Sequence, residues 1–193
     1  MPHPDAQLWN ARYLSNQGYY LRRQPYPLVR TYADQLPAGG LALDVAAGAA
    51  PAGLFLAGRG LRVIAVDIAE TGLRLAQQRA RDLSLPLSLV VMDTSDLWLP
   101  PSRFDIILDF YYLSRPLFEC YRQALKPGGW LFFETFVQGT HRRCNPAHYL
   151  ESGELYSAFQ DWEILHWAET WKKRRDSTLS SRRIAQLVAR KTA

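Results

Sequence analysis

Residues 41–51 read Leu-Ala-Leu-Asp-Val-Ala-Ala-Gly-Ala-Ala-Pro, and this stretch decides the fold of the chain. Five residues of strand character run into five of the smallest side chains, and Pro51 then begins a helix. The small side chains let the backbone approach a ligand at the carboxyl end of the strand. The next apolar run ends in Asp67, 23 residues after Asp44, where the acid of a nucleotide-binding βαβ unit accepts hydrogen bonds from ribose hydroxyls. The stretch therefore predicts a site for a ligand that carries a ribose.

Phosphate-binding motifs are missing from this region, and their absence narrows the range of possible ligands. Gly48 and Gly53 have the spacing of a P-loop, but Leu54 and Phe55 stand where lysine and a hydroxyl residue would meet a phosphate. The dinucleotide pattern Gly-x-Gly-x-x-Gly is also absent, and Pro51 lacks an amide that would hold a pyrophosphate. The pocket suits a ligand without phosphates.

The same residues resemble the first motif of the class I S-adenosylmethionine-dependent methyltransferases, which reads acid-x-Gly-x-Gly-x-Gly. Gly48 is retained, Ala46 is familiar in small members, and Ala50 departs from the pattern. The resemblance implies that S-adenosylmethionine is the cofactor and that Asp44, Ala46, Gly48 and Asp67 bind it. The methyl group of Ala50 costs little if φ is negative and considerably more if φ is positive, so cofactor affinity depends on that angle.

Later segments extend the resemblance. Residues 90–94 resemble the third strand and its following acid, which implies that Asp93, Thr94 and Ile68 hold the adenine. Residues 104–110 resemble the fourth strand. Residues 125–135 contain Leu-Lys-Pro-Gly-Gly, the turn into the fifth strand and the most specific match. Residues 9–13 and 145–155 are similar to the small tellurite-resistance-type methyltransferases.

Strand and helix patterns alternate from about residue 41 to 159, which indicates a doubly wound fold. Helices are expected at residues 51–59, 69–83, 114–125 and 150–159. The last two strands, 162–170 and 183–189, are separated only by a short basic stretch, too short for a helical crossover. We therefore predict an α/β fold with a Rossmann-like, mostly parallel seven-stranded sheet and an antiparallel final strand.

The chain is expected to form one methyltransferase domain, with residues 37–193 as the core and residues 1–36 as an N-terminal flap. The flap is rich in tyrosine and arginine, and residues 17–27 contain too many Gly and Pro residues for one helix. Its aromatic side chains either close the site or simply seal one end of the sheet. Arg12 is a candidate for the cofactor carboxylate and Tyr13 for substrate binding.

The acceptor side of the site is expected beyond the fourth strand. Phe110 can offer its face to the sulfonium as part of the cofactor site, and Tyr112 and His141 are candidates for substrate contacts. If the acceptor loses a proton, the candidate bases are Glu134, Tyr112, His141 and His148. We find no nucleophile elbow and no metal-ligand spacing, so neither a hydrolase nor a metal site is predicted.

Composition agrees with one soluble, cytoplasmic enzyme domain without a membrane partner. The chain has 193 residues, 48% of them hydrophobic, two cysteines, and no apolar run that could span a membrane. Its net charge of +5 is concentrated near the C-terminus, where residues 172–181 are expected to form a solvated loop. A small-molecule acceptor is favoured. A nucleic-acid methyltransferase and a catalytically silent cofactor-binding or scaffold protein are the alternatives. The acceptor and the oligomeric state stay open.

Overall fold

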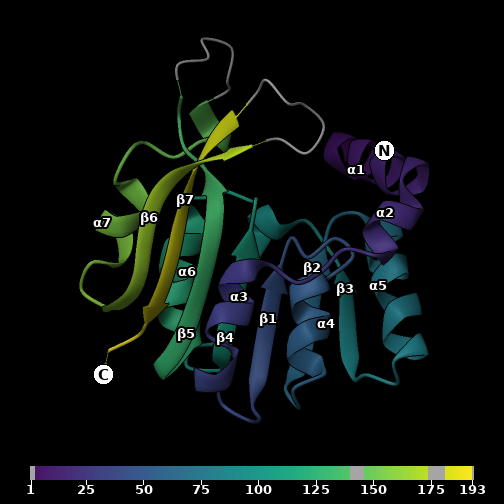
Figure 1. Cartoon of the computed structure of the whole chain (residues 1–193), viewed down its shortest axis with the longest axis horizontal. Helices are drawn as coiled ribbons and strands as arrows, with labels where there is room; N and C mark the ends of the chain where they lie inside the picture. The colour runs from purple at the N-terminus through teal and green to yellow at the C-terminus, as the bar shows by residue number, and fades with distance from the viewer. Residues whose placement is uncertain (1–2, 140–145, 174–180, 193) are drawn as a thin grey trace.

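The computed structural model describes residues 3–139, 146–173 and 181–192, and a seven-stranded sheet forms its central layer (Figure 1). The strands, in the order β3-β2-β1-β4-β5-β7-β6, are β3 (Leu87–Val91), β2 (Arg62–Asp67), β1 (Leu41–Val45), β4 (Phe104–Phe110), β5 (Leu125–Phe136), β7 (Ser181–Arg190) and β6 (Glu163–Lys173). The first five strands in this order, from β3 through β2, β1 and β4 to β5, pair in parallel. Strand β7 runs antiparallel to both β5 and β6. This confirms the predicted fold, including the reversed final strand.

Helices cover both faces of the sheet. The helices between strands are α4 (Pro51–Ala57), α5 (Glu70–Asp82), α6 (Pro116–Ala124) and α7 (Glu154–Phe159), and the N-terminal ones are α1 (Pro4–Ser15), α2 (Gln17–Leu21) and α3 (Pro27–Thr31). Short 3₁₀ turns occur at Ala33–Gln35, Thr94–Asp96 and Pro146–His148. In Figure 1, α3 and α4 lie in front of the sheet and α6 lies behind it. This is the layered arrangement of a doubly wound domain.

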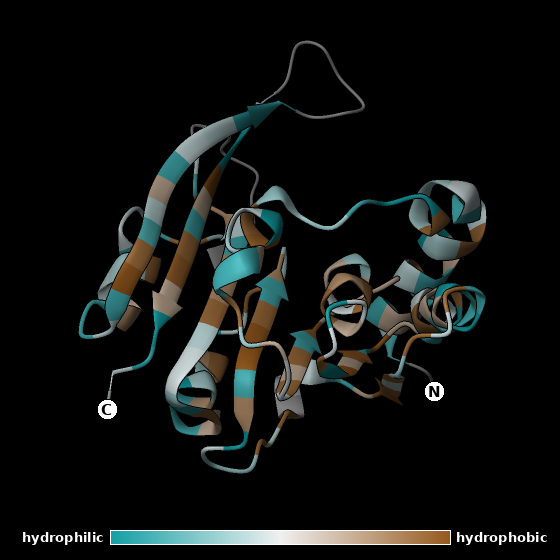
Figure 2. Cartoon of the chain, turned by 60° about the horizontal axis from the view of Figure 1, so that its bottom comes forward, coloured by the Kyte–Doolittle hydropathy of each residue, from teal (hydrophilic) through white to brown (hydrophobic). Residues whose placement is uncertain are grey.

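Two apolar cores form because successive side chains of a strand point to opposite faces. Ile106 and Phe132 pack in front with Leu28 of α3, while Ile107 and Phe133 pack behind with the residues of α6 and α7. In Figure 2 the hydrophobic residues follow the strands through the interior, and hydrophilic residues mark the far end of the β6–β7 hairpin. Burial on both faces explains the near-continuous apolar runs in the sequence.

The helix expected at residues 150–159 is shorter than predicted, and that boundary is a correction. Leu150 forms an isolated parallel bridge with Val137, and Gly153 has φ +80°, so α7 begins only at Glu154. A residue that pairs with an extended strand cannot also open a helix. The other expected helices agree with α4, α5 and α6 to within two residues at each end.

The basic stretch after residue 171 differs from the solvated loop expected from the sequence. Strand β6 continues through Lys172 and Lys173, and β7 begins at Ser181, with Lys172 directly opposite Arg182. Hence that prediction was wrong for Lys172, whose ammonium is held by a buried carboxylate described below. The remaining residues, 174–180, lie outside the described part of the chain.

The N-terminal region packs over the sheet's carboxyl edge and α5. Residues 17–27 do not form one helix, as predicted: α2 ends at Leu21 and Tyr26 is extended before Pro27. Tyr13 of α1 is buried with Ala49, Ala69 and Leu75. Within residues 3–139, 146–173 and 181–192, no helix is both long and apolar enough to cross a membrane.

Candidate cofactor and acceptor site

The turn after β1 has a left-handed backbone at three positions. Ala46, Gly48 and Ala50 have φ of 49°, 56° and 45°. The Ala47 N–H donates to Val66 O at 3.0 Å, and the Ala50 N–H donates to Ala47 O at 2.8 Å. The chain reverses tightly before Pro51 begins α4. The turn stands beside the change in strand order between β1 and β4, where ligands of open α/β sheets bind.

Asp67 ties the tip of β2 to this turn. Its Oδ2 accepts the Gly48 N–H at 2.7 Å, and its Oδ1 accepts the Ala69 N–H at 2.7 Å. Burial raises the pKa of Asp67, and the two amides work against that shift. Each carboxylate oxygen can accept a second hydrogen bond. Asp67 can therefore hold the turn and still receive ribose hydroxyls.

Asp44 lies under the same turn. Its Oδ2 accepts the N–H of Gly53 at 2.9 Å, and a Cβ on Gly53 would meet this oxygen at 2.8 Å, so glycine is required there. Burial raises the pKa of Asp44 to about 7. The Gly53 amide opposes the shift, the charge of Asp67 adds to it, and the charge of Arg23 opposes it. Asp44 thus titrates near neutrality in the site.

The methyl group of Ala50 points away from the ligand side of the turn. It is fully buried and packs with Ala65, Leu73 and Ala76. The sequence left the effect of this methyl dependent on φ, and φ is positive. The cost is backbone strain in the turn, and the methyl group itself packs in the apolar interior.

Tyr13 covers the outer side of the turn. A Cβ on Gly48 would lie 2.0 Å from the Tyr13 hydroxyl oxygen, so only glycine fits beneath this ring. A Cβ on Gly72 of α5 would meet the same ring at 2.8 Å. The structure thus places Tyr13 beside the cofactor turn, although the sequence suggested it for the substrate.

Three of the residues expected at the adenine and acceptor ends lie close together beyond the end of β3: Asp93, Thr94 and Tyr112. Asp93 caps the turn Thr94–Asp96 by accepting the Ser95 N–H, and His3 lies 3.7 Å from its Oδ2. Tyr112, expected near the substrate, instead lies with Thr94 and Asp93. Burial raises its pKa, a hydrogen bond with Thr94 opposes the shift, and the charge of Asp93 adds to it. Ile68 is half-buried after β2.

Phe110 does not have a free face toward a sulfonium. The ring of Tyr26 stacks on it, with centroids 3.9 Å apart and planes at 10°. The guanidinium of Arg23 lies 4.9 Å from the centroid of the Tyr26 ring. Arg12, the arginine expected at the cofactor, is exposed and lies over the ring of Trp9 at 4.7 Å. Arg23 is therefore the arginine that the N-terminal region places in the site.

Glu134, a candidate base, is fully buried and has three partners. Its Oε1 accepts hydrogen bonds from the Tyr111 hydroxyl and from Lys172 Nζ, the latter at 2.7 Å, and its Oε2 accepts from Gln186 Nε2 at 2.7 Å. Lys172 Nζ also donates to the Tyr111 oxygen at 2.6 Å. Tyr111 has φ +68°, so its backbone is left-handed as well. The donors fix the Glu134 side chain in place and orient Tyr111, which favours a positioning role over proton transfer.

Asp109, at the end of β4, has no exposed surface. Its Oδ2 accepts the Tyr121 hydroxyl at 2.8 Å, and its Oδ1 has no hydrogen-bond partner among the described residues. Burial raises the pKa of Asp109 well above its usual range. This carboxyl was not among the candidate site residues predicted from the sequence.

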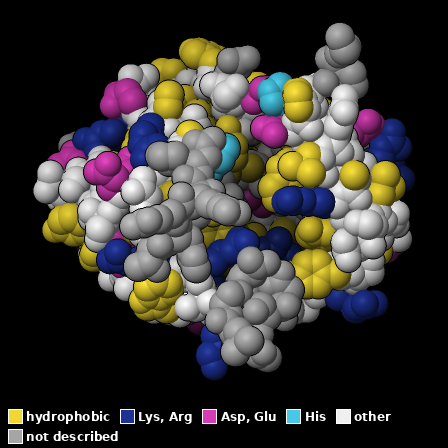
Figure 3. All heavy atoms as spheres, turned by 90° about the horizontal axis from the view of Figure 1, so that it is seen from above, with side chains coloured by type: hydrophobic (Ala, Val, Ile, Leu, Met, Phe, Trp, Pro, Cys, Tyr) yellow, Lys and Arg dark blue, Asp and Glu magenta, His cyan; other side chains and the backbone are white. Residues whose placement is uncertain are grey.

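Figure 3, seen from above, shows a hollow on the carboxyl edge that is bordered by hydrophobic side chains as well as by lysine and arginine side chains. Two pockets lie elsewhere, of about 410 Å³ beside Arg115 and Glu154 and of about 280 Å³ beside Asp105 and Trp130. Neither lining contains the turn of residues 46–50. In that turn Tyr13 already fills the space over Gly48.

Two other sequence-based candidates contribute nothing to this site. His141 lies outside the described residues, and His148 is exposed on its 3₁₀ turn. Among the residues that the structure describes, no three His, Cys, Asp or Glu side chains are placed to hold a metal ion.

Comparison with known proteins finds similarity to methyltransferases. Residues 42–129 match a family model described as a methyltransferase domain, and no curated protein sequence matches the chain. TehB from Haemophilus influenzae has a TM-score of 0.75 at 18% identity, covering 86% of this chain and 62% of TehB. A SAM-dependent methyltransferase from Methanosarcina mazei has a TM-score of 0.68 at 21% identity, covering 88% of this chain and 99% of that one.

A third structure contains ligands. Geranyl diphosphate C-methyltransferase from Streptomyces coelicolor, in complex with Mg²⁺, geranyl diphosphate and S-adenosyl-L-homocysteine, has a TM-score of 0.69 at 15% identity. The match covers 86% of this chain and 76% of the Streptomyces coelicolor chain. Residues 42–129 are therefore similar to a methyltransferase domain, and the chain has the fold of S-adenosylmethionine-dependent methyltransferases. It spans less than two thirds of the length of TehB.

Proposed function

We propose that the protein transfers the methyl group of S-adenosylmethionine to a small-molecule acceptor. The observation that supports this best is the left-handed turn at residues 46–50, held by Asp67 at the change in strand order. Backbone that approaches a ligand closely, beside a buried acid at the next strand tip, suits a ribose and a sulfonium without phosphates.

The cofactor lies across the carboxyl edge in this proposal. Asp67 accepts the ribose hydroxyls, and Ile68, Asp93, Thr94 and Tyr112 surround the adenine. The amino-acid end meets Asp44 and Arg23, whose charge already influences the pKa of Asp44. Arg23 replaces Arg12 in this role, because an arginine can bind a carboxylate through two parallel hydrogen bonds only if it faces the site.

The sulfonium supplies an activated methyl group when the cofactor is bound. The protein then has to align the acceptor at about 3 Å and exclude water, which lowers the barrier through effective molarity. Tyr13 and Tyr26 cover the site from the N-terminal side, and Tyr111 is fixed beside it by Glu134 and Lys172. No proton transfer by Glu134 is required if the acceptor arrives as an anion.

A small acceptor is favoured because the N-terminal region lies over the turn. Tyr13 is 7% exposed and Tyr26 stacks on Phe110, so a nucleic-acid duplex could not reach the edge without displacing both. The ligand-bound enzyme from Streptomyces coelicolor acts on geranyl diphosphate, which is also a small molecule.

We propose that the protein is located in the cytoplasm. The free thiol of Cys120 fits the reducing conditions of that compartment.

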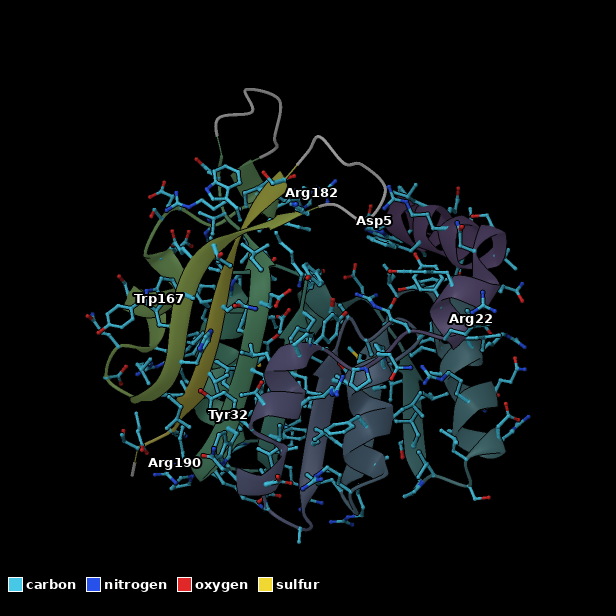
Figure 4. All side chains as sticks on the ribbon, viewed as in Figure 1. Asp5, Arg22, Tyr32, Trp167, Arg182 and Arg190 are labelled. Atoms are coloured by element: carbon cyan, nitrogen blue, oxygen red, sulfur yellow. The ribbon has the colours of Figure 1, made fainter. Side chains whose placement is uncertain are left out.

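Titration calorimetry with S-adenosylhomocysteine tests the cofactor site. Arg23→Gln should weaken binding at least tenfold, whereas Arg22→Gln removes the same charge from the outer side of α2 and should leave affinity unchanged (Figure 4). Mass spectrometry of a metabolite extract incubated with labelled S-adenosylmethionine then identifies the acceptor. Binding without any transfer would favour the silent protein, and labelling of added RNA or DNA would favour the nucleic-acid enzyme.

A further inference from the structure

The front face of β5 changes character toward its carboxyl end. Trp130 and Phe132 lie under Tyr32, with ring centroids at 6.1 Å and 6.3 Å. The next two residues on this face are Glu134 and Phe136, because alternate residues of a strand share a face. Past the part of the sheet that Tyr32 covers, β5 thus presents a carboxylate and then an aromatic ring.

The ring of Phe136 forms an aromatic surface with Tyr111. Their centroids are 5.2 Å apart and their planes are inclined by 36°. Both residues are only half-buried, although each is a large aromatic side chain at a strand end. Such a surface can stack with a flat apolar group.

Two cations reach this surface from the hairpin. Lys172 and Arg182 are directly opposite each other in β6 and β7, so their side chains leave the same face. The guanidinium of Arg182 lies 5.0 Å from the centroid of Phe136, and Lys172 Nζ lies 5.4 Å from that of Tyr111. Figure 4 shows Arg182 where the hairpin extends past the sheet, on the side toward α1.

The charges of these two cations are not equally compensated. Glu134 neutralises Lys172, and two of the three ammonium N–H groups already donate to Glu134 and Tyr111. Arg182 makes no ion pair with any acidic residue within the described ranges. Within the described ranges, therefore, one N–H of Lys172 has no acceptor and the guanidinium of Arg182 has no acidic partner, and both cations lie beside the two rings.

We propose that the acceptor is a planar organic anion, whose flat body lies on Tyr111 and Phe136 and whose carboxylate or similar group binds Arg182 and Lys172. This inference rests on the proposed methyl transfer and names the substrate class. A guanidinium binds a carboxylate through two parallel hydrogen bonds, and an uncompensated cation disfavours a positively charged acceptor. The cofactor contacts at Asp67 and Asp93 are separate from this surface.

The test uses the full chain saturated with S-adenosylhomocysteine, whose binding is measured first. Calorimetry then compares matched probes: benzoate with benzamide, 4-hydroxybenzoate with 4-hydroxybenzamide, indole-3-acetate with indole-3-acetamide, and 4-hydroxybenzylamine as a cation. At least one carboxylate should bind tenfold more tightly than its amide, and the amine should bind most weakly. The proposal is overturned if no carboxylate binds more tightly than its amide. Failure of the first titration would instead contradict the cofactor assignment.

Arg182→Gln should abolish the preference for the carboxylate and leave the affinity for S-adenosylhomocysteine and the melting temperature unchanged. Lys173→Gln is the matched control, because it removes one positive charge from the next residue of β6, whose side chain leaves the opposite face. Arg182→Lys should restore part of the preference. Equal losses in Arg182→Gln and Lys173→Gln would show that net charge alone attracts the anion, and would overturn the proposed site.

Discussion

The Oδ2 atom of Asp67 accepts the backbone N–H of Gly48 at 2.7 Å, which joins the tip of β2 to the turn that follows β1. The second oxygen accepts the Ala69 N–H, so the same carboxylate also fixes the entry to α5. The expected ribose acid therefore has a structural task as well. Its removal should affect both stability and ligand binding.

Asp67→Ala should weaken the binding of S-adenosylhomocysteine at least tenfold and lower the free energy of unfolding by about 1–3 kcal/mol, since two buried amides lose their acceptor. Calorimetry and urea unfolding measure the two effects. Asp93→Ala is the comparison: its side chain is 34% exposed, so stability should change little and affinity should fall less. Unchanged affinity in Asp67→Ala would contradict the assignment.

Ala50→Gly should leave cofactor affinity nearly unchanged and stabilise the protein slightly. A left-handed alanine costs about 1–2 kcal/mol of stability. Glycine relieves this strain but adds entropy to the unfolded chain, which costs about 0.4–1 kcal/mol. Urea unfolding should therefore show a gain of between about 0 and 1.6 kcal/mol. In the regular helix α5, Ala80→Gly should be destabilising. If Ala50→Gly destabilised equally, the strain argument would fail.

Lys172→Met should destabilise the protein because Glu134 would keep a buried charge without its cation. We expect a loss of about 1–3 kcal/mol, below the usual cost for a fully buried pair, since the Lys172 side chain is 43% exposed and water replaces part of the interaction. The double variant Glu134→Gln, Lys172→Met should recover much of this loss. A double-mutant cycle in urea measures the coupling, and additive effects would exclude it.

Asp44 should make stability depend on pH between about 4 and 7. Its pKa is about 7 in the folded protein and about 3.9 in an unfolded chain, so the folded state holds the proton more tightly. The stabilisation is complete below about pH 4 and is lost as the pH rises to about 7. The side chain in Asp44→Asn cannot titrate. As the pH rises from about 4 to 7, the stability of this variant relative to wild type should therefore increase, by at most about 1.4 kcal/mol per pH unit.

Asp105 offers a control, because its contribution to stability should depend on pH in the opposite direction to that of Asp44. Burial works to raise its pKa, but Lys126 and the Leu41 amide bring it below the usual value. The stability that Asp105 contributes is present above about pH 4 and is lost in acid. Asp105→Asn should therefore lose stability relative to wild type at neutral pH and approach it as the pH falls through the lowered pKa of Asp105. Parallel pH profiles for the two variants would contradict both assignments.

The sequence by itself determined the sheet and the turn after β1, because both depend on local patterns. Apolar runs mark strands that are buried on two faces, small residues before Pro51 mark the turn, and a short connection forces the final strand to reverse. The position of Asp67 follows from the length of one βαβ unit. These features need no knowledge of distant contacts.

Only the tertiary structure decided which side chains from outside this unit lie beside the candidate site. The sequence suggested Arg12, but α1 leaves Arg12 on the surface while the extended chain before α3 brings Arg23 to Tyr26. Lys172 reads as one charge in a solvated run, yet 38 residues separate it from the buried Glu134 that holds it. Such pairings depend on how the hairpin lies across β5, and no local pattern records a contact made only when the sheet has closed.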